Sequence, residues 1–118
     1  MIKKHFSDVK EEKVTMANSV NTTIRWLVTK DDGAENFAMR RFVLGEKGKI
    51  GLHGHPEDHE IYVLSGEARV FNDKGQEVIA KEGDVLYVPP DELHAYENTG
   101  SEPFEFICVV PILKKKLT

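Results

Sequence analysis

His53-Gly54-His55-Pro56-Glu57-Asp58-His59-Glu60 holds three of the five histidines in the chain, and a fourth, His94, lies in a separate segment. Two histidines at i and i+2 of an extended strand point to the same side. The third follows four residues later, past a proline and two acids that can turn the chain. Imidazole is the commonest protein ligand for divalent transition metals. The four rings therefore predict one metal site; unrelated polar core or surface positions are the alternative interpretation.

The length of 118 residues predicts a single domain with a sizeable core. Hydrophobic residues make up 40% and charged residues 31%, and 20 acids against 16 bases give a formal charge of −4. This balance, without a dense basic patch in the folded region, argues against nucleic acid as a partner. The run of three lysines at 114–116 is interpreted as a solvated tail.

The chain shows no feature expected of a membrane or secreted protein. Its longest apolar stretch, residues 106–113, is too short to cross a membrane and contains Pro111. The first six residues lack the apolar core of a secretory signal. A single cysteine, Cys108, excludes an internal disulfide. We therefore expect a cytoplasmic protein with no membrane partner.

Short runs rich in Val, Ile, Phe and Tyr, separated by glycine-containing turns, are typical of an all-β sandwich or barrel. No 3.6-residue apolar period is long enough to predict a major helix. Asp73-Lys74-Gly75 between two such runs is a strong hairpin signal. The predicted strands cover residues 14–18, 23–29, 37–44, 49–55, 60–65, 67–72, 77–80, 84–88, 94–98 and 105–110.

The alternation of side chains indicates which faces are buried. Phe104, Phe106 and Cys108 share a strand face opposite Glu105, and are therefore predicted to face the interior. A similar pattern places Trp26 on a face that either closes the barrel or packs against a second subunit.

The two histidine segments resemble the two motifs of the cupin superfamily. The first motif is a glycine, five residues, H-x-H, three or four residues, a glutamate, six residues and a glycine, matched here by His53, His55 and Gly66. The second is a glycine, five residues, a proline, any residue, a glycine, two residues, a histidine, three residues and an asparagine, matched here by Gly83, Pro89, His94 and Asn98. The motifs occupy about residues 48–66 and 83–98 of a single domain, residues 1–118. The resemblance implies a jelly-roll barrel, or double-stranded β-helix, with a metal inside.

Three positions depart from these motifs. Lys47 stands where the first glycine is expected, and Asp91, which can also adopt turn geometry, stands where a later glycine is expected. His59 and Glu60 compete for the place of the glutamate. Counting back from Gly66, six residues intervene for His59 and five for Glu60, so the spacing favours His59.

Alternation prevents His59 and Glu60 from both pointing inward from a regular strand. The arrangement resembles that of small four-histidine cupins that bind manganese, several of them from thermophiles. This resemblance implies His53, His55, His59 and His94 as the ligands. Glu60 is then structural or supports a ligand, and it remains the alternative ligand.

The chemistry follows from this ligand set. Four neutral imidazoles leave the double positive charge of the ion uncompensated, and an octahedral ion keeps two positions for other ligands. One divalent ion per chain is expected, manganese first, with iron, nickel or zinc as alternatives. No other cofactor is predicted, and catalytic residues stay unassigned.

Two adjacent arginines bear on the ligand of such a pocket. Arg40 and Arg41 follow one another in a strand, so one of them faces inward, where it can hold a substrate carboxylate. The resemblance favours Arg40. A salt bridge at the surface or at a dimer edge is the alternative role.

Four further residues are pocket candidates. Tyr96 shares the strand face of His94, and Cys108 is either a thiol facing the metal or a small buried apolar residue. Phe104 and Phe106 either line a substrate cavity or fill the barrel.

The leading function is a small metal-dependent oxidoreductase, dioxygenase-like, acting on a small organic molecule. An isomerase, decarboxylase or other lyase is the second hypothesis, and a non-catalytic ligand-binding module is the third. A homodimer through edge strands is expected.

Overall fold

The computed structural model describes residues 1–113, so the lysine run at 114–116 lies outside the described residues. The described chain is all-β, with short 3-10 turns and no α-helix, as predicted. The turns are η1 (Phe6–Asp8), η2 (Met16–Asn18) and η3 (Lys30–Asp32). The strands are β1 (Glu12–Lys13), β2 (Val20–Val28), β3 (Phe37–His53), β4 (His59–Ser65), β5 (Glu67–Asn72), β6 (Glu77–Lys81), β7 (Val85–Val88), β8 (His94–Asn98) and β9 (Phe104–Pro111).

Two of the predicted strand assignments are wrong. The strand expected at residues 14–18 is replaced by η2, because Ala17 and Asn18 take two consecutive left-handed backbone angles, φ 53° and 56°, which turn the chain. The separate strands expected at 37–44 and 49–55 are one strand, β3, which ends at His53. The glycines in its middle, which suggested a turn, lie within a continuous strand that bends.

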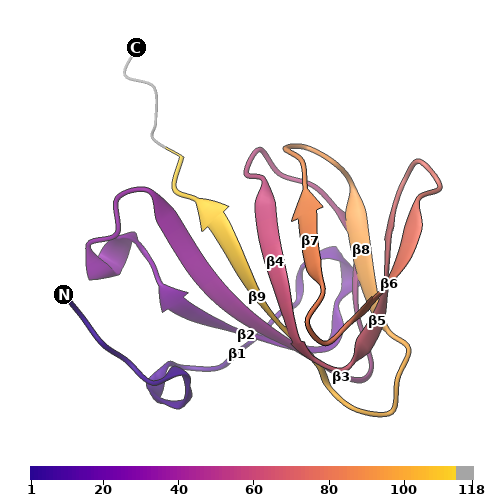
Figure 1. Ribbon diagram of the computed structural model, residues 1–118, viewed down its shortest axis with the longest axis horizontal. Helices are drawn as coiled ribbons and strands as arrows, with labels where there is room; N and C mark the ends of the chain where they lie inside the picture. The colour runs from indigo at the N-terminus through magenta and orange to yellow at the C-terminus, as the bar shows by residue number, and fades with distance from the viewer. Residues whose placement is uncertain (114–118) are drawn as a thin grey trace.

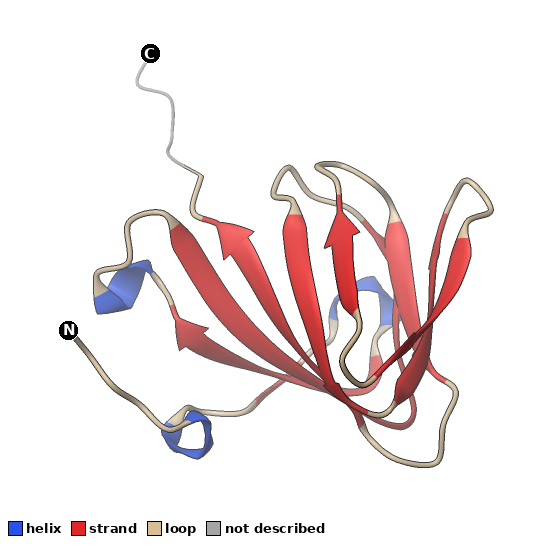
Figure 2. Ribbon diagram, in the orientation of Figure 1, coloured by secondary structure: helices blue, strands red, loops and turns tan. Residues whose placement is uncertain are grey.

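The long strand β3 joins two layers of a jelly-roll barrel. Its first part, Phe37 to Leu44, pairs with β9, and its last part, Lys49 to His53, pairs with β8. The hydrogen-bonded order is β6-β5-β8-β3-β9-β4-β7, with β2 added beside β3 and β1 beside β2. Figure 1 shows this sheet curling from β2 and β9 round to β5 and β6. Figure 2 shows that strands make up the wall, while η1 and η3 lie outside it.

The core fills the space between the layers. Phe104, Phe106 and Cys108 are at most 1% exposed, which confirms the inward face predicted for β9. Phe106 stacks on Phe42 at a ring-centroid distance of 5.0 Å and on Tyr96 at 5.3 Å. These aromatic side chains pack beneath the histidine rings.

Both residues that replace a motif glycine keep the geometry that favours glycine. Lys47 has φ 58° and Asp91 has φ 64°, in the left-handed region. Asn98, at the asparagine position of the second motif, holds the neighbouring turns. Its Nδ2 donates to the carbonyl oxygens of Leu44 and Glu102, at 3.0 and 2.9 Å. The backbone path of the motifs is therefore retained despite the substitutions.

Candidate metal centre

The structure brings the four predicted histidines into one cluster. His53 ends β3, His59 begins β4 and His94 begins β8, while His55 lies in the loop after β3 rather than on the strand. The ring centroids of His55 and His59 are 4.3 Å apart, those of His53 and His94 4.4 Å, and those of His59 and His94 5.2 Å. Four imidazoles from three strands and a loop thus meet at one end of the barrel.

Backbone carbonyls fix two of the rings. His53 Nδ1 donates to the Gly51 oxygen at 2.8 Å, and His94 Nδ1 donates to the Glu92 oxygen at 2.8 Å. Because a carbonyl can only accept, the proton is on Nδ1 and the lone pair is on Nε2 of each ring. His94 Nε2 is buried and has no hydrogen-bond partner. A metal ligand requires such a nitrogen, which is buried, has no hydrogen-bond partner and belongs to a ring held in place through its other nitrogen.

The other two rings face one another. Their Nε2 atoms, on His55 and His59, lie 2.5 Å apart. On the outer side, His55 Nδ1 lies 3.1 Å from a Glu57 carboxylate oxygen, without hydrogen-bond geometry. His59 Nδ1 lies 2.8 Å from Cys108 Sγ and 3.1 Å from Arg40 Nη2. In all four histidines, therefore, Nδ1 faces protein groups and Nε2 faces the cluster.

The donor set fits a divalent metal after a small adjustment. Within residues 1–113, no group of three or more His, Cys, Asp or Glu side chains is already arranged to hold an ion. Two nitrogens bound at about 2.1 Å on adjacent positions of an octahedron are about 3 Å apart. His55 and His59 must therefore separate by about half an ångström from their present 2.5 Å. His55 can move most easily, since it lies in a loop and is partly exposed.

The environment keeps the clustered rings neutral. Burial, together with the charge of the nearby Arg40 guanidinium, lowers the pKa of His59 to about 2. Burial also lowers the pKa of His94 to about 4, and it lowers the pKa of His53. Metals bind neutral imidazole, so at neutral pH these three side chains are already in the form that coordinates.

A cavity of about 280 Å³ opens beside the cluster. Arg40 points into it from β3, whereas Arg41 points outward and pairs with Glu105 at 3.4 Å. The cavity is lined by Glu12, Lys13, Val14, Thr15, Met16, Ile24, Trp26, Arg40, Phe42, Ile50, His53, His55, His59, Tyr96, Phe106 and Cys108.

Arg40 is the only arginine among these lining residues, and Glu12, the one acidic residue among them, pairs with Lys10 instead. Its Nε is buried without a hydrogen-bond partner, and Nη2 donates to Cys108 Sγ at 3.1 Å. The guanidinium also lies 5.5 Å from the ring centre of Trp26 and 5.1 Å from that of Phe42. Within the described part of the chain, no acidic side chain forms an ion pair with it. An uncompensated cation in a largely apolar cavity favours an anionic guest.

The other pocket candidates divide into two groups. Tyr96, Phe106 and Cys108 line the cavity, and burial raises the pKa of both Tyr96 and Cys108, so that both are protonated at neutral pH. Phe104 is fully buried and does not line the cavity. It fills the barrel because it lies two residues further from the histidines along β9.

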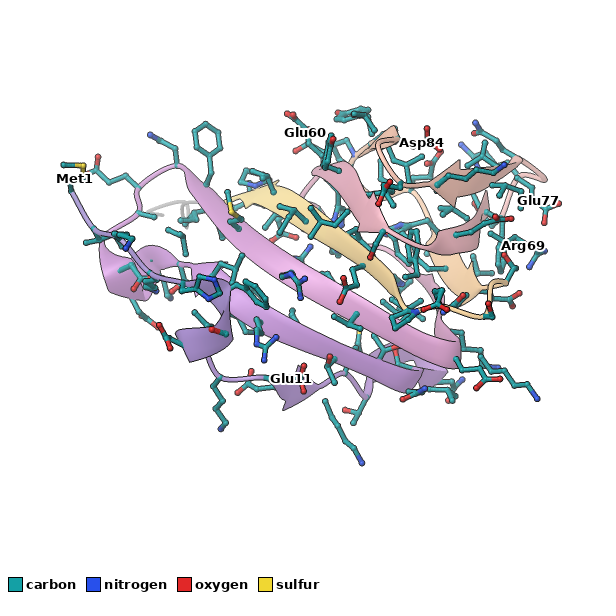
Figure 3. All side chains as sticks on the ribbon, turned by 60° about the horizontal axis from the view of Figure 1, so that its bottom comes forward. Met1, Glu11, Glu60, Arg69, Glu77 and Asp84 are labelled. Atoms are coloured by element: carbon teal, nitrogen blue, oxygen red, sulfur yellow. The ribbon has the colours of Figure 1, made fainter. Side chains whose placement is uncertain are left out.

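Glu60, the alternative ligand, lies on the other side of the sheet. It is exposed, whereas its neighbour His59 is 4% exposed. Figure 3 shows Glu60 projecting outward from the sheet. The alternation along β4 therefore turns His59, and not Glu60, towards the cluster.

Sequence reasoning missed one wall of the cavity. Residues 12–16 line it although they precede both motifs and match no pattern of cavity residues. Trp26, placed on a face of undecided role, lies at the rim of the cavity and is 42% exposed. For Trp26 the alternation along β2 was the signal; for residues 12–16 the sequence offered none.

Known proteins share this fold and these motifs. The family described as Cupin domain matches residues 40–110. The oxalate-binding protein of Thermotoga maritima is 42% identical over 74 residues, which are 62% of this chain and 60% of that protein's length. Among solved structures, the polyketide cyclase RemF of Streptomyces resistomycificus has a TM-score of 0.87 at 31% identity, covering 94% of this chain and 79% of that one. A predicted oxalate decarboxylase of Thermotoga maritima has a TM-score of 0.83 at 28% identity, covering 95% of this chain and all of that one.

One negative observation accompanies these matches. Residues 1–113 include no helix with the length and apolarity needed to span a bilayer.

The family match spans more than half of the chain and contains all four clustered histidines. The chain belongs to the cupin family.

Proposed function

We propose that this cupin is a divalent-metal-dependent enzyme that acts on a small organic anion. The observation that carries the proposal is Arg40, whose guanidinium faces the cavity beside the histidine cluster without an ion-pair partner. A carboxylate that reaches the cluster would place one end near the four imidazoles and its charge near Arg40.

His53, His55, His59 and His94 would hold the ion through Nε2, with manganese as the first candidate and iron, nickel or zinc behind it. The bound ion would supply Lewis acidity and open positions for a ligand. The change needed for binding lies between His55 and His59, whose Nε2 atoms must lose any shared proton.

Loss of that proton has a consequence for Arg40. When Nε2 of His59 gives its lone pair to an ion, the ring hydrogen is on Nδ1, which then becomes a donor. Arg40 Nη2, 3.1 Å away, is also a donor, so the pair loses its hydrogen bond. Cys108 Sγ, 2.8 Å from Nδ1, can accept in its place. Arg40 would then keep its hydrogen bond to Cys108 Sγ and have more donor capacity for a ligand.

The reaction class proposed first is a non-redox conversion of a carboxylate, such as decarboxylation. Its support is the likeness to proteins named as an oxalate-binding protein, a polyketide cyclase and a predicted oxalate decarboxylase. A dioxygenase-like oxidoreductase is the second candidate. It is favoured by the all-imidazole donor set and by the apolar walls of the cavity, Phe42, Ile50 and Phe106.

Turnover assays separate these classes. Protein reconstituted with manganese, iron, nickel or zinc would be incubated with oxalate, other small carboxylates, diketones and catechols. Carbon dioxide release or isomerisation without oxygen uptake supports the first class, and oxygen uptake in proportion to substrate supports the second. Saturable binding of a carboxylate with no turnover by any metal form would instead assign a ligand-binding role and refute an enzyme.

We also propose a homodimer, formed through the outer face of β4, β7 and β9. Tyr62 lies opposite Val85 on one side and Ile107 on the other, so their side chains form a cross-strand row. Tyr62 is 52%, Tyr87 58% and Val85 71% exposed. Together these three expose on the order of 300 Å² of side-chain surface, which is within the range of the largest apolar patch on a typical monomer, a patch that is often functional. A two-fold pairing of the patch and its surroundings would approach the roughly 800 Å² that each partner of a stable pair buries.

Sedimentation of Tyr62→Glu tests this interface, because a charge buried in the row would separate the subunits. Ile79→Glu is the control, since Ile79 is 47% exposed on β6, outside the patch. A wild-type monomer, or a dimer that survives Tyr62→Glu, would refute the assignment. The cytoplasm remains our proposed compartment, and the free, buried Cys108 is compatible with it.

A further inference from the structure

One wall of the cavity is built by a single short segment near the start of the chain. Residues 12–16, here called the N-terminal wall, contribute five consecutive side chains to the lining. All the other lining residues come from β2, β3, β4, β8, β9 and the loop that holds His55. Figure 2 shows η2, which begins at Met16, within the outline of the curved sheet, and η2 contacts β3.

The wall has few attachments along its length. The two residues of β1 pair with Ile24 and Thr23 of β2, and Val14 N donates to the Thr22 oxygen at 3.0 Å. Beyond these bonds the wall has no regular pairing, so its position depends strongly on how its far end is seated.

The far end of the wall is seated against β3 at Gly51. A Cβ atom at Gly51 would overlap the carbonyl oxygen of Ala17, so the absence of a side chain permits this close approach. Ala17 has φ 53°, a left-handed angle that is costly for alanine and is retained where packing demands it. Gly51 also accepts the hydrogen bond from His53 Nδ1, so the wall rests on the same residue that orients a clustered histidine.

The wall lies outside the part of the chain that defines the family. The Cupin domain match begins at residue 40, whereas the wall ends at Met16. The clustered histidines and Arg40 all fall inside the match. Because the N-terminal wall is added to a centre that the family shares, it can differ between cupins that bind different ligands.

We propose that the N-terminal wall sets the largest ligand that reaches the metal centre, with Met16 as the residue that determines this size. Met16 lines the cavity and is 47% exposed, so its side chain has room to adopt several rotamers. Its unbranched thioether gives a wall that adapts to small guests and blocks large ones. This inference rests on the proposed function, because it assumes that an organic anion binds beside the histidines.

Fluorescence of Trp26 provides the measurement. Trp26 is the only tryptophan of the chain and lines the same cavity, so a bound guest changes its emission. Manganese-loaded protein would be titrated with acetate, benzoate and 2-naphthoate, which share a carboxylate and increase in size. The variants are Met16→Ala and Met16→Phe, with Ile79→Phe as the control. Ile79 has the same 47% exposure as Met16 and lies outside the cavity.

Met16→Phe should weaken 2-naphthoate by about tenfold, Met16→Ala should strengthen it several-fold, and acetate should stay within about twofold in both. Ile79→Phe should match the wild type for all three acids. Equal changes for all three acids, or none in either Met16 variant, would overturn the inference while leaving the proposed function intact. A wild type that takes up manganese and binds none of the acids would overturn both. Metal content, measured on every variant, should stay equal to that of the wild type.

Discussion

Replacing Arg40 by methionine should leave the stability of the metal-free protein nearly unchanged and make the protein a poorer binder of anions. Arg40 places its guanidinium in a largely apolar cavity without a carboxylate partner, with Nε fully buried. Methionine keeps an unbranched apolar stem of similar length and removes the charge. A side chain whose removal weakens ligand binding but leaves stability unchanged is expected of a charge held in place for a ligand.

The magnitudes follow from the contacts. The variant loses hydrogen bonds to Cys108 Sγ and His59 Nδ1, worth about 1 kcal/mol each, and contacts with the rings of Trp26 and Phe42, worth about 0.5 kcal/mol each. It is relieved of an unpaired, partly buried charge, which costs roughly 3 kcal/mol. The gain and the losses nearly cancel, so the free energy of unfolding should change by less than about 1 kcal/mol. A lost charge-assisted contact of about 1.5–3 kcal/mol weakens a bound carboxylate roughly 10- to 150-fold.

Urea denaturation followed by circular dichroism gives the stability, and calorimetry with benzoate and manganese-loaded protein gives the affinity. Arg41→Met is the matched control, because Arg41 is adjacent, faces outward and pairs with Glu105. It should lose about 1–2 kcal/mol of stability, because its side chain is only 11% exposed and its guanidinium also lies 4.1 Å from the ring centre of Phe6, and it should keep its affinity for benzoate. An Arg40→Met protein that is less stable by more than about 1 kcal/mol and binds benzoate normally would show that Arg40 is structural, and the reasoning would be refuted.

Three further predictions concern the cluster and the core. His94→Ala should lose most of its bound manganese and Glu60→Ala should keep it, because His94 turns a free nitrogen to the cluster whereas Glu60 is exposed on the other side of the sheet. Elemental analysis and electron paramagnetic resonance measure the bound metal. Metal loss in Glu60→Ala alone would reverse the assignment. Acid should destabilise the metal-free protein: the folded-state pKa of His94 is lowered to about 4 from 6.5, so the unfolded chain binds more protons in between. The free energy of unfolding is therefore highest above pH 6.5, and it falls by about 1.4 kcal/mol per pH unit for each buried histidine as the pH drops towards 4. Urea titrations at several pH values should show this slope, and His94→Gln should reduce it. Phe104→Ala should cost about 3–5 kcal/mol, because the ring is fully buried, and a loss under 1 kcal/mol in urea would contradict its place in the core.

The sequence predicted best where side-chain periodicity and motif spacing act together. The six-residue interval before Gly66 favoured His59, and the structure buries His59 and exposes Glu60. Alternation alone required that Arg40 and Arg41 point to opposite faces, as they do. In both cases the period of two along a strand leaves a residue only two directions, so one neighbour determines the other.

Prediction failed where the outcome depends on distant contacts. The left-handed angle at Ala17 accompanies the close approach of its carbonyl oxygen to Gly51, a distant contact that no local pattern predicts. The glycines of β3 indicated a break between two strands. None of the neighbouring strands β2, β8 and β9 pairs with residues 45–48, but the side chains of Asn21 and Asn98 donate to the carbonyl oxygens of Glu46 and Gly45 and hold the chain as one bent strand. The position of Phe104 below the cavity, rather than in its wall, likewise depends on how far along β9 the histidines project.

The continuity of β3 also determines how the two halves of the binding site communicate. Arg40 and His53 lie on the same strand, the first in the part paired with β9 and the second at the end paired with β8. A flexible hinge between them would let each adjust separately to its own part of a guest. The Asn98 side chain, which donates to the carbonyl oxygens of Leu44 and Gly45, instead holds the bend between these two anchors and so fixes their spacing. We therefore expect the site to distinguish guests by the spacing of their polar groups as well as by their size.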